Sequence, residues 1–383
     1  GERIPNANPF QQNANAAADF LLNSNETAAT EIVDNEAEGT RYVMVDWKLA
    51  DPRSNKYTAP AAFDSLGVTA YDPAGSNLID TVVYQRLFGS QPRPALFVRS
   101  QAHYDSMRTR LYAFHGSAAD PRVNGQVLVV DWNPNGVDYG QGSLPGPSNQ
   151  TIRYFDTMDA AEEFVRNDGS AQVGGVQGVP TEPVPALEHY RLVHASEETN
   201  RQVGPWVKTF ERVNGATVEG TGPANATVTA SVEMRIPTQN GTRYETFTYS
   251  QRAETDDQGR FTMTLPYSST GYDEFGPDNG HTNVSVRATG PYEFRNVQSA
   301  GNGTQVVTNT TADVTEAQVL GEDDSVVEVS LDETTTIEGN ASANGTDESA
   351  APNGSTGAND TDTANDTNDT ATNGSAGTND TDT

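Results

Sequence analysis

The sequence predicts a mixed α+β protein with an α/β core over residues 1–200, an antiparallel immunoglobulin-like β-sandwich over 201–331 and a disordered acidic tail over 332–383. Strand-like and helix-like segments interleave in the first region, which favours an α/β core. Short segments with period-two alternation, separated by turn signals, fill the second region and indicate a sandwich of about seven strands. The third region has no aromatic residue, Lys or Arg, so burial cannot offset the entropy lost on ordering.

Three helices are expected in the first region, each from an apolar stripe with a start or stop signal. The first begins at Pro9, because proline suits the first helical position. The second runs from a Ser100 cap to a stop at Gly116, and the third begins at Asp156 or Thr157. The apolar stripes consist of Phe10, Ala14, Ala17 and Leu21 in the first helix, and of Tyr104, Met107, Leu111 and Phe114 in the second.

Strands are expected wherever β-branched and aromatic residues alternate or cluster between turn signals. The expected strands span 41–46, 126–132, 151–155 and 190–193 in the first region, and 227–234, 243–250, 260–265 and 283–288 in the second. The turn signals include Asn214-Gly215, Asn240-Gly241 and the run from Asp256 to Gly259. That run resembles part of a calcium loop, but it lacks the later ligands, which favours a hairpin turn.

Charge and composition restrict the classes of partner. The net charge is -30, and only three of the 23 basic residues are lysines: Lys48, Lys56 and Lys208. A surface rich in carboxylates and poor in lysine is typical of halophilic proteins, because molar salt screens its self-repulsion. Such a surface repels phosphates and anionic lipid heads, so we expect no nucleic-acid partner.

Several classes of site find no support in the sequence. Without cysteine there are no disulfides, thiolate metal sites or thiol nucleophiles. The five histidines show no metal-ligand spacing, and no Gly-x-Ser-x-Gly elbow indicates a hydrolase. No run of 18 apolar residues is long enough to span a bilayer, and the start at Gly1 is that expected of a piece of a longer protein. We therefore assign no catalytic residue and no metal ligand.

The most repeated motif is the N-glycosylation acceptor Asn-x-Ser/Thr. In the body of the chain it begins at Asn25, Asn149, Asn225, Asn240, Asn283, Asn302 and Asn309, and in the tail at Asn340, Asn344, Asn353, Asn359, Asn365, Asn368, Asn373 and Asn379. A tail made largely of Asn, Asp and Thr generates such triplets by composition alone. Their number nevertheless predicts exposure outside the cell membrane, where such sites are modified.

Four segments resemble archaeal oligosaccharyltransferases of the AglB type. The opening run from Arg3 to Gln12 resembles the segment that follows the family's WWDYG motif, and the family continues with a small-residue helix and a strand ending in Asp, as at Tyr42–Asp46 here. Lys56-Tyr57 occupies the position of the Lys-aromatic pair of the family's Asp-x-x-Lys motif. The run Leu187–His194 resembles the segment that closes the family's central domain.

The resemblance implies a membrane glycosyltransferase that transfers an oligosaccharide from a dolichyl phosphate carrier to Asn in Asn-x-Ser/Thr. It implies a divalent cation, Mg or Mn, whose ligands lie in a membrane half outside this chain, with this region on the extracellular face of a multi-pass protein. The implied partners are an acceptor protein with a sequon, a lipid-linked oligosaccharide and the N-terminal transmembrane half of the same protein.

For the residues present, the resemblance implies a wall of the acceptor-peptide site. Lys56 would contact the region of the Ser/Thr hydroxyl, and Asp51 or Asp46 would serve as its charge partner. The match is loosened here, since the strict spacing would place the acid at position 53, which is Arg53. The alternative interpretation is a secreted halophilic surface glycoprotein, in which an immunoglobulin-like domain is carried on a Thr/Asp-rich stalk.

Overall fold

The structure of the chain is a computed structural model, and its described residues lie within the range Gly1–Ser342. The described residues are 9–36, 40–46, 68–72, 77–80, 97–99, 101–131, 137–138, 143–144, 152–168, 171–175, 178–196, 199–200, 204–237, 244–301, 304–331 and 333–337. The rest of the predicted tail lies outside these residues, as do Asp51 and Lys56.

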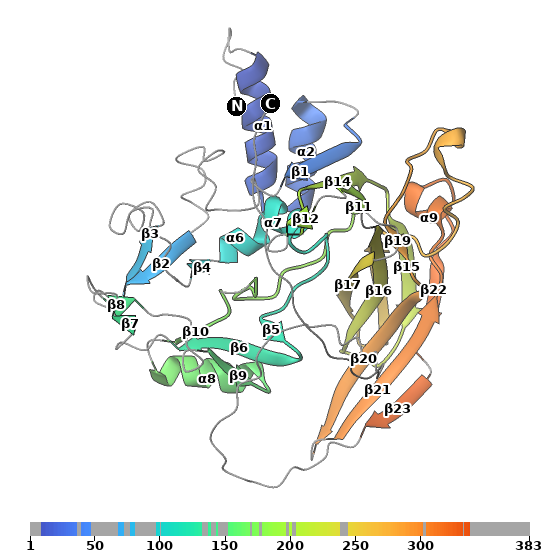
Figure 1. Ribbon diagram of the computed structural model, residues 1–383. Coiled ribbons are helices and arrows are strands. Elements are labelled where there is room, and N and C mark those ends of the chain that lie inside the picture. Colours follow the sequence, from blue (N-terminus) through green and yellow to red (C-terminus); the bar gives the residue numbers. More distant parts are fainter. Residues whose placement is uncertain are drawn as a thin grey trace, which may run out of the picture. The chain divides into compact units, whose positions relative to one another are not determined.

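The helices of the described residues largely follow the sequence prediction (Figure 1). They are α1 (Pro9–Leu22), α2 (Glu26–Glu36), α6 (Gln101–Asp105), α7 (Met107–Tyr112), α8 (Met158–Asp168), α9 (Glu316–Leu320) and the 3-10 turn η1 (Pro277–Asn279). The expected helix after Ser100 is divided in two, because the Ser106 side chain accepts a hydrogen bond from the Thr109 N–H and starts a new helix. The prediction missed α2, whose start is capped by the Asn25 Oδ1, 2.9 Å from the Ala28 nitrogen.

The strands of the first region form small sheets. They are β1 (Tyr42–Asp46), β2 (Val68–Asp72), β3 (Asn77–Asp80), β4 (Phe97–Arg99), β5 (Arg122–Val123), β6 (Gln126–Asp131), β7 (Val137–Asp138), β8 (Ser143–Leu144), β9 (Ile152–Phe155), β10 (Ala171–Val173), β11 (Tyr190–Ala195) and β12 (Thr199–Asn200). β6 is buried on both faces, with Val127 and Val129 against Ala161 of α8, and Leu128 and Val130 in a second cluster.

The mixed α+β class is confirmed, but every pairing between described strands of this region is antiparallel. The expectation of an α/β core therefore needs correction. A two-residue Asn124-Gly125 turn, with φ of 51° and 84°, joins β5 directly to β6 as a hairpin. α8 does connect two strands in crossover fashion, yet β6 lies between those strands and runs antiparallel to both β9 and β10.

Most strands of the second region lie in two sheets, one of three and one of six strands (Figure 1). Its strands are β13 (Gly204–Pro205), β14 (Val207–Arg212), β15 (Ala216–Thr221), β16 (Thr227–Pro237), β17 (Tyr244–Glu254), β18 (Arg260–Leu265), β19 (Arg287–Ala288), β20 (Tyr292–Gly301), β21 (Thr304–Ala312), β22 (Val327–Ser330) and β23 (Glu333–Ile337). The first sheet has the order β18-β15-β22, in which β15 and β22 are parallel. The second has the order β17-β16-β20-β21-β23, and β19 also pairs with β16.

The structure differs from the prediction at three local points. The strand expected at 283–288 is reduced to β19, and Val284 and Val286 are buried although they lie in irregular backbone. The Asp256–Gly259 run is a turn as predicted, but β17 and β18, which it joins, belong to different sheets. β23 lies inside the stretch predicted to be disordered, where the β-branched run Thr334–Ile337 favours a strand and pairs with β21.

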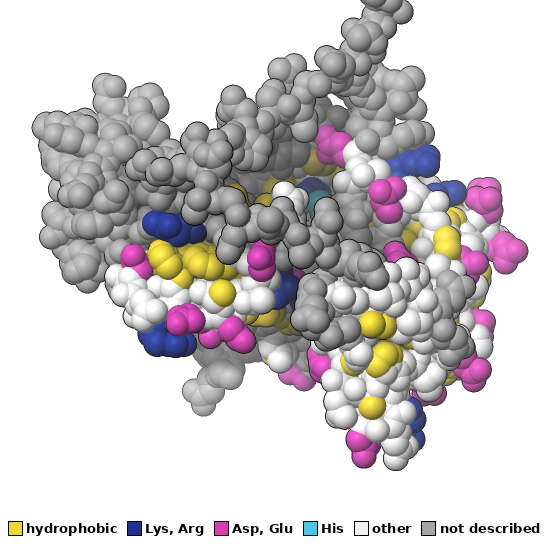
Figure 2. All heavy atoms as spheres, turned by 90° about the horizontal axis from the view of Figure 1, so that it is seen from below, with side chains coloured by type: hydrophobic (Ala, Val, Ile, Leu, Met, Phe, Trp, Pro, Cys, Tyr) yellow, Lys and Arg dark blue, Asp and Glu magenta, His cyan; other side chains and the backbone are white. Residues whose placement is uncertain are grey.

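One large core runs through both predicted regions. Leu21 of α1, Leu111 of α7 and Phe210 of β14 are buried in the same cluster as Tyr249 of β17 and Phe294 of β20. β14, which follows the predicted boundary at residue 200, lies between β1 and β11, which precede it. Acidic side chains are spread around the described surface in Figure 2, in keeping with the charge excess of the sequence.

Candidate functional site

The sheet β1-β14-β11 brings together two of the four segments that carry the sequence resemblance. β1 ends at Asp46, β11 begins within the run Leu187–His194, and β14 pairs with both strands. α1 packs against α7, and α7 contacts β1. α2 is attached to the same place, since the Glu26 carboxylate accepts hydrogen bonds from the backbone N–H groups of Glu188 and His189, at 2.9 and 2.8 Å.

Asp46 is the one predicted site residue within the described part of the chain. It is half-buried at the end of β1, opposite Val207 of β14. Its negative charge acts on Tyr112 of α7: burial, and then the Asp46 carboxylate, raise the pKa of the Tyr112 phenol. The phenol remains neutral and donates a 2.6 Å hydrogen bond to the Pro205 carbonyl. The backbone that leads from Asp46 toward residues 51 and 56 thus starts from a packed position.

A buried lysine, Lys208, follows Val207, which is the residue of β14 that pairs with Asp46. Lys208 is 4% exposed, and its Nζ lies 4.2 Å from the centre of the Tyr112 ring. The ammonium donates to the Tyr112 carbonyl and faces His115 Nε2, each at 2.7 Å. Burial lowers the pKa of Lys208 to about 8, although the charge of Glu245 opposes this shift. Burial and the adjacent ammonium lower the pKa of His115, so its neutral ring can accept the hydrogen bond.

Sequence reasoning assigned no role to Lys208, although a signal was present. β14 alternates so that Lys208 and Phe210 share a face, and Phe210 is plainly a core residue. A lysine in register with a buried phenylalanine is a lysine on the buried face. The scarcity of lysine in the chain makes this position more unusual.

A second buried charged group connects this sheet to the second region. Arg191 of β11, Glu211 of β14 and Glu316 of α9 are each at most 1% exposed. The Arg191 guanidinium donates to both oxygens of Glu316 at 2.7 Å, and its Nη2 and Nε donate to Glu211 at 2.8 and 3.1 Å. Arg41 adds a second cation on Glu211, with Nε at 2.7 Å, and Ser268 donates to Glu316 at 2.5 Å.

The electrostatics of this cluster are balanced. Two carboxylates face two guanidinium groups, so the group of four carries no net charge. Burial alone would raise the pKa of Glu211, but Arg191, the Thr282 hydroxyl and Arg41 outweigh it and lower that pKa. The carboxylate therefore stays ionised, and the cluster is a structural fastening between β11, β14 and α9.

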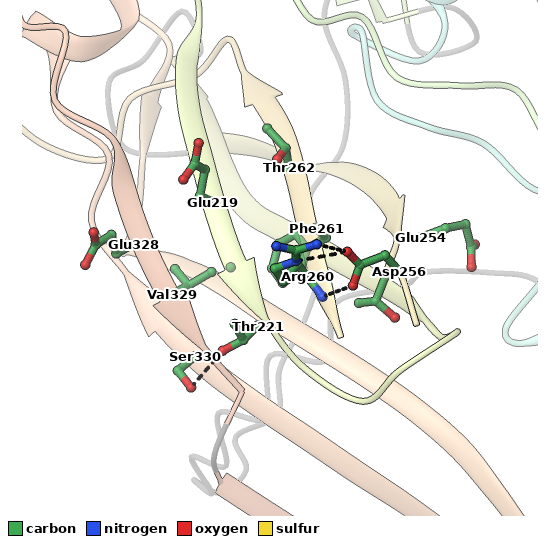
Figure 3. A pocket seen from close by; sticks show the side chains of 12 residues that line it. Glu219, Thr221, Glu254, Asp256, Arg260, Phe261, Thr262, Glu328, Val329 and Ser330 are labelled. Carbon is green, nitrogen blue, oxygen red and sulfur yellow. Dashed lines mark hydrogen bonds and ion pairs between the residues drawn. The ribbon is translucent and has the colours of Figure 1, made fainter. Parts of the chain in front are cut away.

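A third feature is an open groove of about 940 Å³ on the outer face of β15, β18 and β22 (Figure 3). Four carboxylates line it, those of Glu219, Glu254, Asp256 and Glu328, together with Arg260. Figure 3 shows Arg260 turned toward Asp256, with its Nε 3.0 Å from Asp256 Oδ2. The excess of negative charge suits ligands that donate hydrogen bonds, such as sugar hydroxyls, and disfavours phosphates.

The described ranges contain neither a metal-ligand group nor a membrane-spanning helix. Among these residues, no group of three or more His, Asp or Glu side chains is arranged to hold a metal ion. The described side chains therefore do not fit a divalent cation. Nor do the described residues include a helix long and apolar enough to cross a membrane.

Comparison with known proteins gives consistent matches. Residues 215–325 match the family described as the Archaeal glycosylation protein B long peripheral domain. The chain is 43% identical over 374 residues to the dolichyl-monophosphooligosaccharide–protein glycotransferase AglB of Haloferax volcanii, covering 87% of this chain and 34% of that protein. It is 27% identical over 345 residues to dolichyl-phosphooligosaccharide-protein glycotransferase 3 of Archaeoglobus fulgidus, covering 83% and 35%.

Solved structures of the Archaeoglobus fulgidus oligosaccharyltransferase are also similar. The apo form has a TM-score of 0.44 at 18% identity, covering 86% of this chain and 35% of that one. The complex with an inhibitory peptide and a dolichol-phosphate has a TM-score of 0.42 at 19% identity, covering 86% and 35%. This chain spans about a third of the length of the curated relatives that it matches. The sequence matches show that the chain belongs to the AglB family of archaeal glycosylation proteins.

Proposed function

We propose that this chain is the C-terminal, extracellular part of a multi-pass membrane oligosaccharyltransferase. The complete enzyme would transfer a glycan from a dolichyl phosphate carrier to Asn in Asn-x-Ser/Thr. The observation that carries this proposal is the 43% identity to a glycotransferase of that name over most of the chain. We further propose that residues 201–331 form an immunoglobulin-like sandwich after a core of residues 1–200. The support for the sandwich is that residues of its two sheets, such as Val218 of β15 and Phe294 of β20, are buried in one cluster.

Within that enzyme, we propose that this chain forms one wall of the acceptor-peptide site and supplies no catalytic residue. The segment after β1 would carry Lys56 to the Ser/Thr hydroxyl of the sequon, with Asp51 or Asp46 as its charge partner. The packed start of this segment supports the proposal: Asp46 ends a strand paired with β14. A lysine ammonium on its flexible stem can donate to a hydroxyl or a backbone carbonyl of the acceptor.

The cation of the reaction belongs elsewhere in the proposed enzyme. A divalent cation, Mg or Mn, would offset charge on the leaving phosphate when bound. The described residues offer no ligand group for it. The remaining partners proposed are the acceptor protein, the lipid-linked oligosaccharide and the N-terminal transmembrane half.

Peptide glycosylation kinetics with the full-length enzyme and an Asn-x-Thr acceptor test the role of Lys56. If Lys56 donates a charged hydrogen bond in the acceptor site, Lys56→Ala lowers kcat/KM by about 10- to 100-fold, and Lys56→Arg restores part of it. The matched control is Arg166→Ala, which removes one exposed positive charge from α8. Equal kcat/KM for Lys56→Ala and Arg166→Ala would contradict the proposed acceptor role.

A further inference from the structure

The sequons of the chain are themselves potential acceptors, and the structure distinguishes between them. Four sequons lie wholly within described residues, those beginning at Asn25, Asn225, Asn283 and Asn309. Attachment of a glycan requires an exposed amide nitrogen, space for the sugar, and a backbone that an enzyme can bind in an extended form. These requirements separate the four sites.

Asn225 meets the first two requirements. It is exposed in the turn between β15 and β16, with a left-handed φ of 52°, and among the described residues its side-chain amide has no hydrogen-bond partner. Its backbone N–H donates at 3.2 Å to the carbonyl of Asp256, which lines the groove in Figure 3. An attached sugar would therefore meet open space lined by carboxylates and hydroxyls, which can hydrogen-bond to sugar hydroxyls.

The hydroxyl of this sequon is also easily released. Thr227 is exposed, and its Oγ1 donates to Glu254 Oε1 at 2.6 Å. Thr227 is the first residue of β16 and pairs with Glu254, the last residue of β17. The intervening Ala226 is buried: its N–H donates to the Thr255 hydroxyl and its carbonyl accepts from the Thr255 N–H, both at 2.9 Å. The Thr227 carbonyl accepts a hydrogen bond from the Asn296 side chain at 2.8 Å. Presenting the sequon to an enzyme therefore requires opening the first residues of β16, at a strand end, where local opening costs less than in the middle of a sheet.

The other three sequons are held in different ways. Ser285, the hydroxyl residue of the Asn283 sequon, donates to the Val193 carbonyl through both its N–H and its Oγ, each at 2.9 Å. Asn309 lies inside the second sheet, paired on one side with Arg295 and on the other with Glu333. Asn25 caps α2 through its own side chain, so binding it in extended form would unwind the start of that helix.

We propose that Asn225 of this chain carries an N-linked glycan, added from a lipid-phosphate-linked oligosaccharide. The Asn225 Nδ2 would bond to the anomeric carbon of the first sugar and lose one proton. The bond from that carbon to the carrier phosphate breaks, and the phosphate leaves with the electron pair. The inference rests on the proposed function for its setting, because it places this region where such donors are used.

Glycopeptide mass spectrometry tests this proposal on the full-length protein, produced in an archaeal host together with a reporter glycoprotein. Tryptic peptide 213–235 contains Asn225 as its sole sequon, and peptide 261–287 contains only that of Asn283. We expect glycan occupancy at Asn225 to exceed that at Asn283 by at least about tenfold, because Thr227 is exposed whereas the Ser285 hydroxyl is half-buried against the Val193 carbonyl. Thr227→Ser gives both sites the same Asn-x-Ser form, and the ranking is expected to persist.

Two outcomes would overturn the proposal: a bare peptide 213–235 from cells whose reporter is glycosylated, or equal occupancy at the two sites in Thr227→Ser. Asn225→Gln provides the reference mass for the unmodified protein. Transfer by the purified protein to an added Asn-x-Thr peptide is measured separately. That assay tests the proposed enzyme function. The reporter shows separately that the host cells glycosylate sequons, so the result at Asn225 can be interpreted whatever the enzyme assay gives.

Discussion

Replacing Glu316 with glutamine tests whether the buried charged cluster fastens α9 to the β1-β14-β11 sheet. The substitution keeps the size and shape of the side chain but removes one negative charge from a neutral group of four. Glu316 accepts two hydrogen bonds from Arg191 at 2.7 Å and one from Ser268 at 2.5 Å. Glutamine can retain only some of these hydrogen bonds, since it has one acceptor oxygen where glutamate has two.

The expected cost follows from burial. Arg191 is 1% exposed and cannot recover water when its partner is neutralised. Removing one partner of a buried ion pair costs about 3–5 kcal/mol, and the retained acceptor places Glu316→Gln near the lower end, at about 3 kcal/mol of unfolding free energy. Because the cluster is shielded from solvent, this loss should change little with ionic strength.

Urea denaturation of the chain, followed by circular dichroism, measures this loss. Asp120→Asn is the matched control, because Asp120 forms a partly exposed ion pair with Arg252 at 2.7 Å and should cost about 0–1 kcal/mol. A double-mutant cycle with Arg191→Met should give a coupling energy of about 2–3 kcal/mol. A cost for Glu316→Gln equal to that of Asp120→Asn would show that the cluster does not hold the two elements together.

Two further substitutions test the buried lysine and a turn. The pKa of Lys208 is lowered to about 8 in the folded chain, against 10.5 in the unfolded chain. Between these two pH values the unfolded chain binds more protons than the folded chain, so the free energy of unfolding should rise with pH across that window. Lys208→Met should abolish this rise in denaturation curves measured from pH 8 to 10, and an unchanged slope would contradict the assignment. Gly259 has a φ of +77°, and an added Cβ would lie 2.2 Å from the Gly222 carbonyl oxygen, so Gly259→Ala should cost about 2–3 kcal/mol of unfolding free energy. Gly125→Ala, at φ +84° with open space around it, should cost only about 1 kcal/mol in the same urea titration, and equal costs would rule out the steric reason.

Elements with strong local signals could be predicted from the sequence. Pro9 at a helix start and the alternating run of β16 each encode their structure within a few residues, and both were found. What failed was long-range pairing. The interleaved pattern around β6 predicted an α/β core, whereas β6 pairs antiparallel with β9 and β10, which follow it only after long connections.

The candidate site shows the same limit. Asp46 was placed correctly at a strand end by the apolar run before it. No local pattern could show that Glu316 would meet Arg191, because the two residues lie 125 positions apart and come together only when α9 docks. Lys208 was detectable through its alternation with Phe210, but its contact with His115 depends on how α7 ends.

The location of these charges also bears on the salt dependence that the composition predicts. Molar salt screens attraction between exposed charges as well as repulsion, so surface ion pairs such as Arg252–Asp120 contribute little under those conditions. A chain with a net charge of -30 that is adapted to such salt can obtain directional ionic contacts only where salt does not reach. The Arg191, Glu211 and Glu316 cluster lies in such a place, between the predicted core and the predicted sandwich. We therefore expect the junction of the two regions to keep its strength at salt concentrations that weaken the surface pairs.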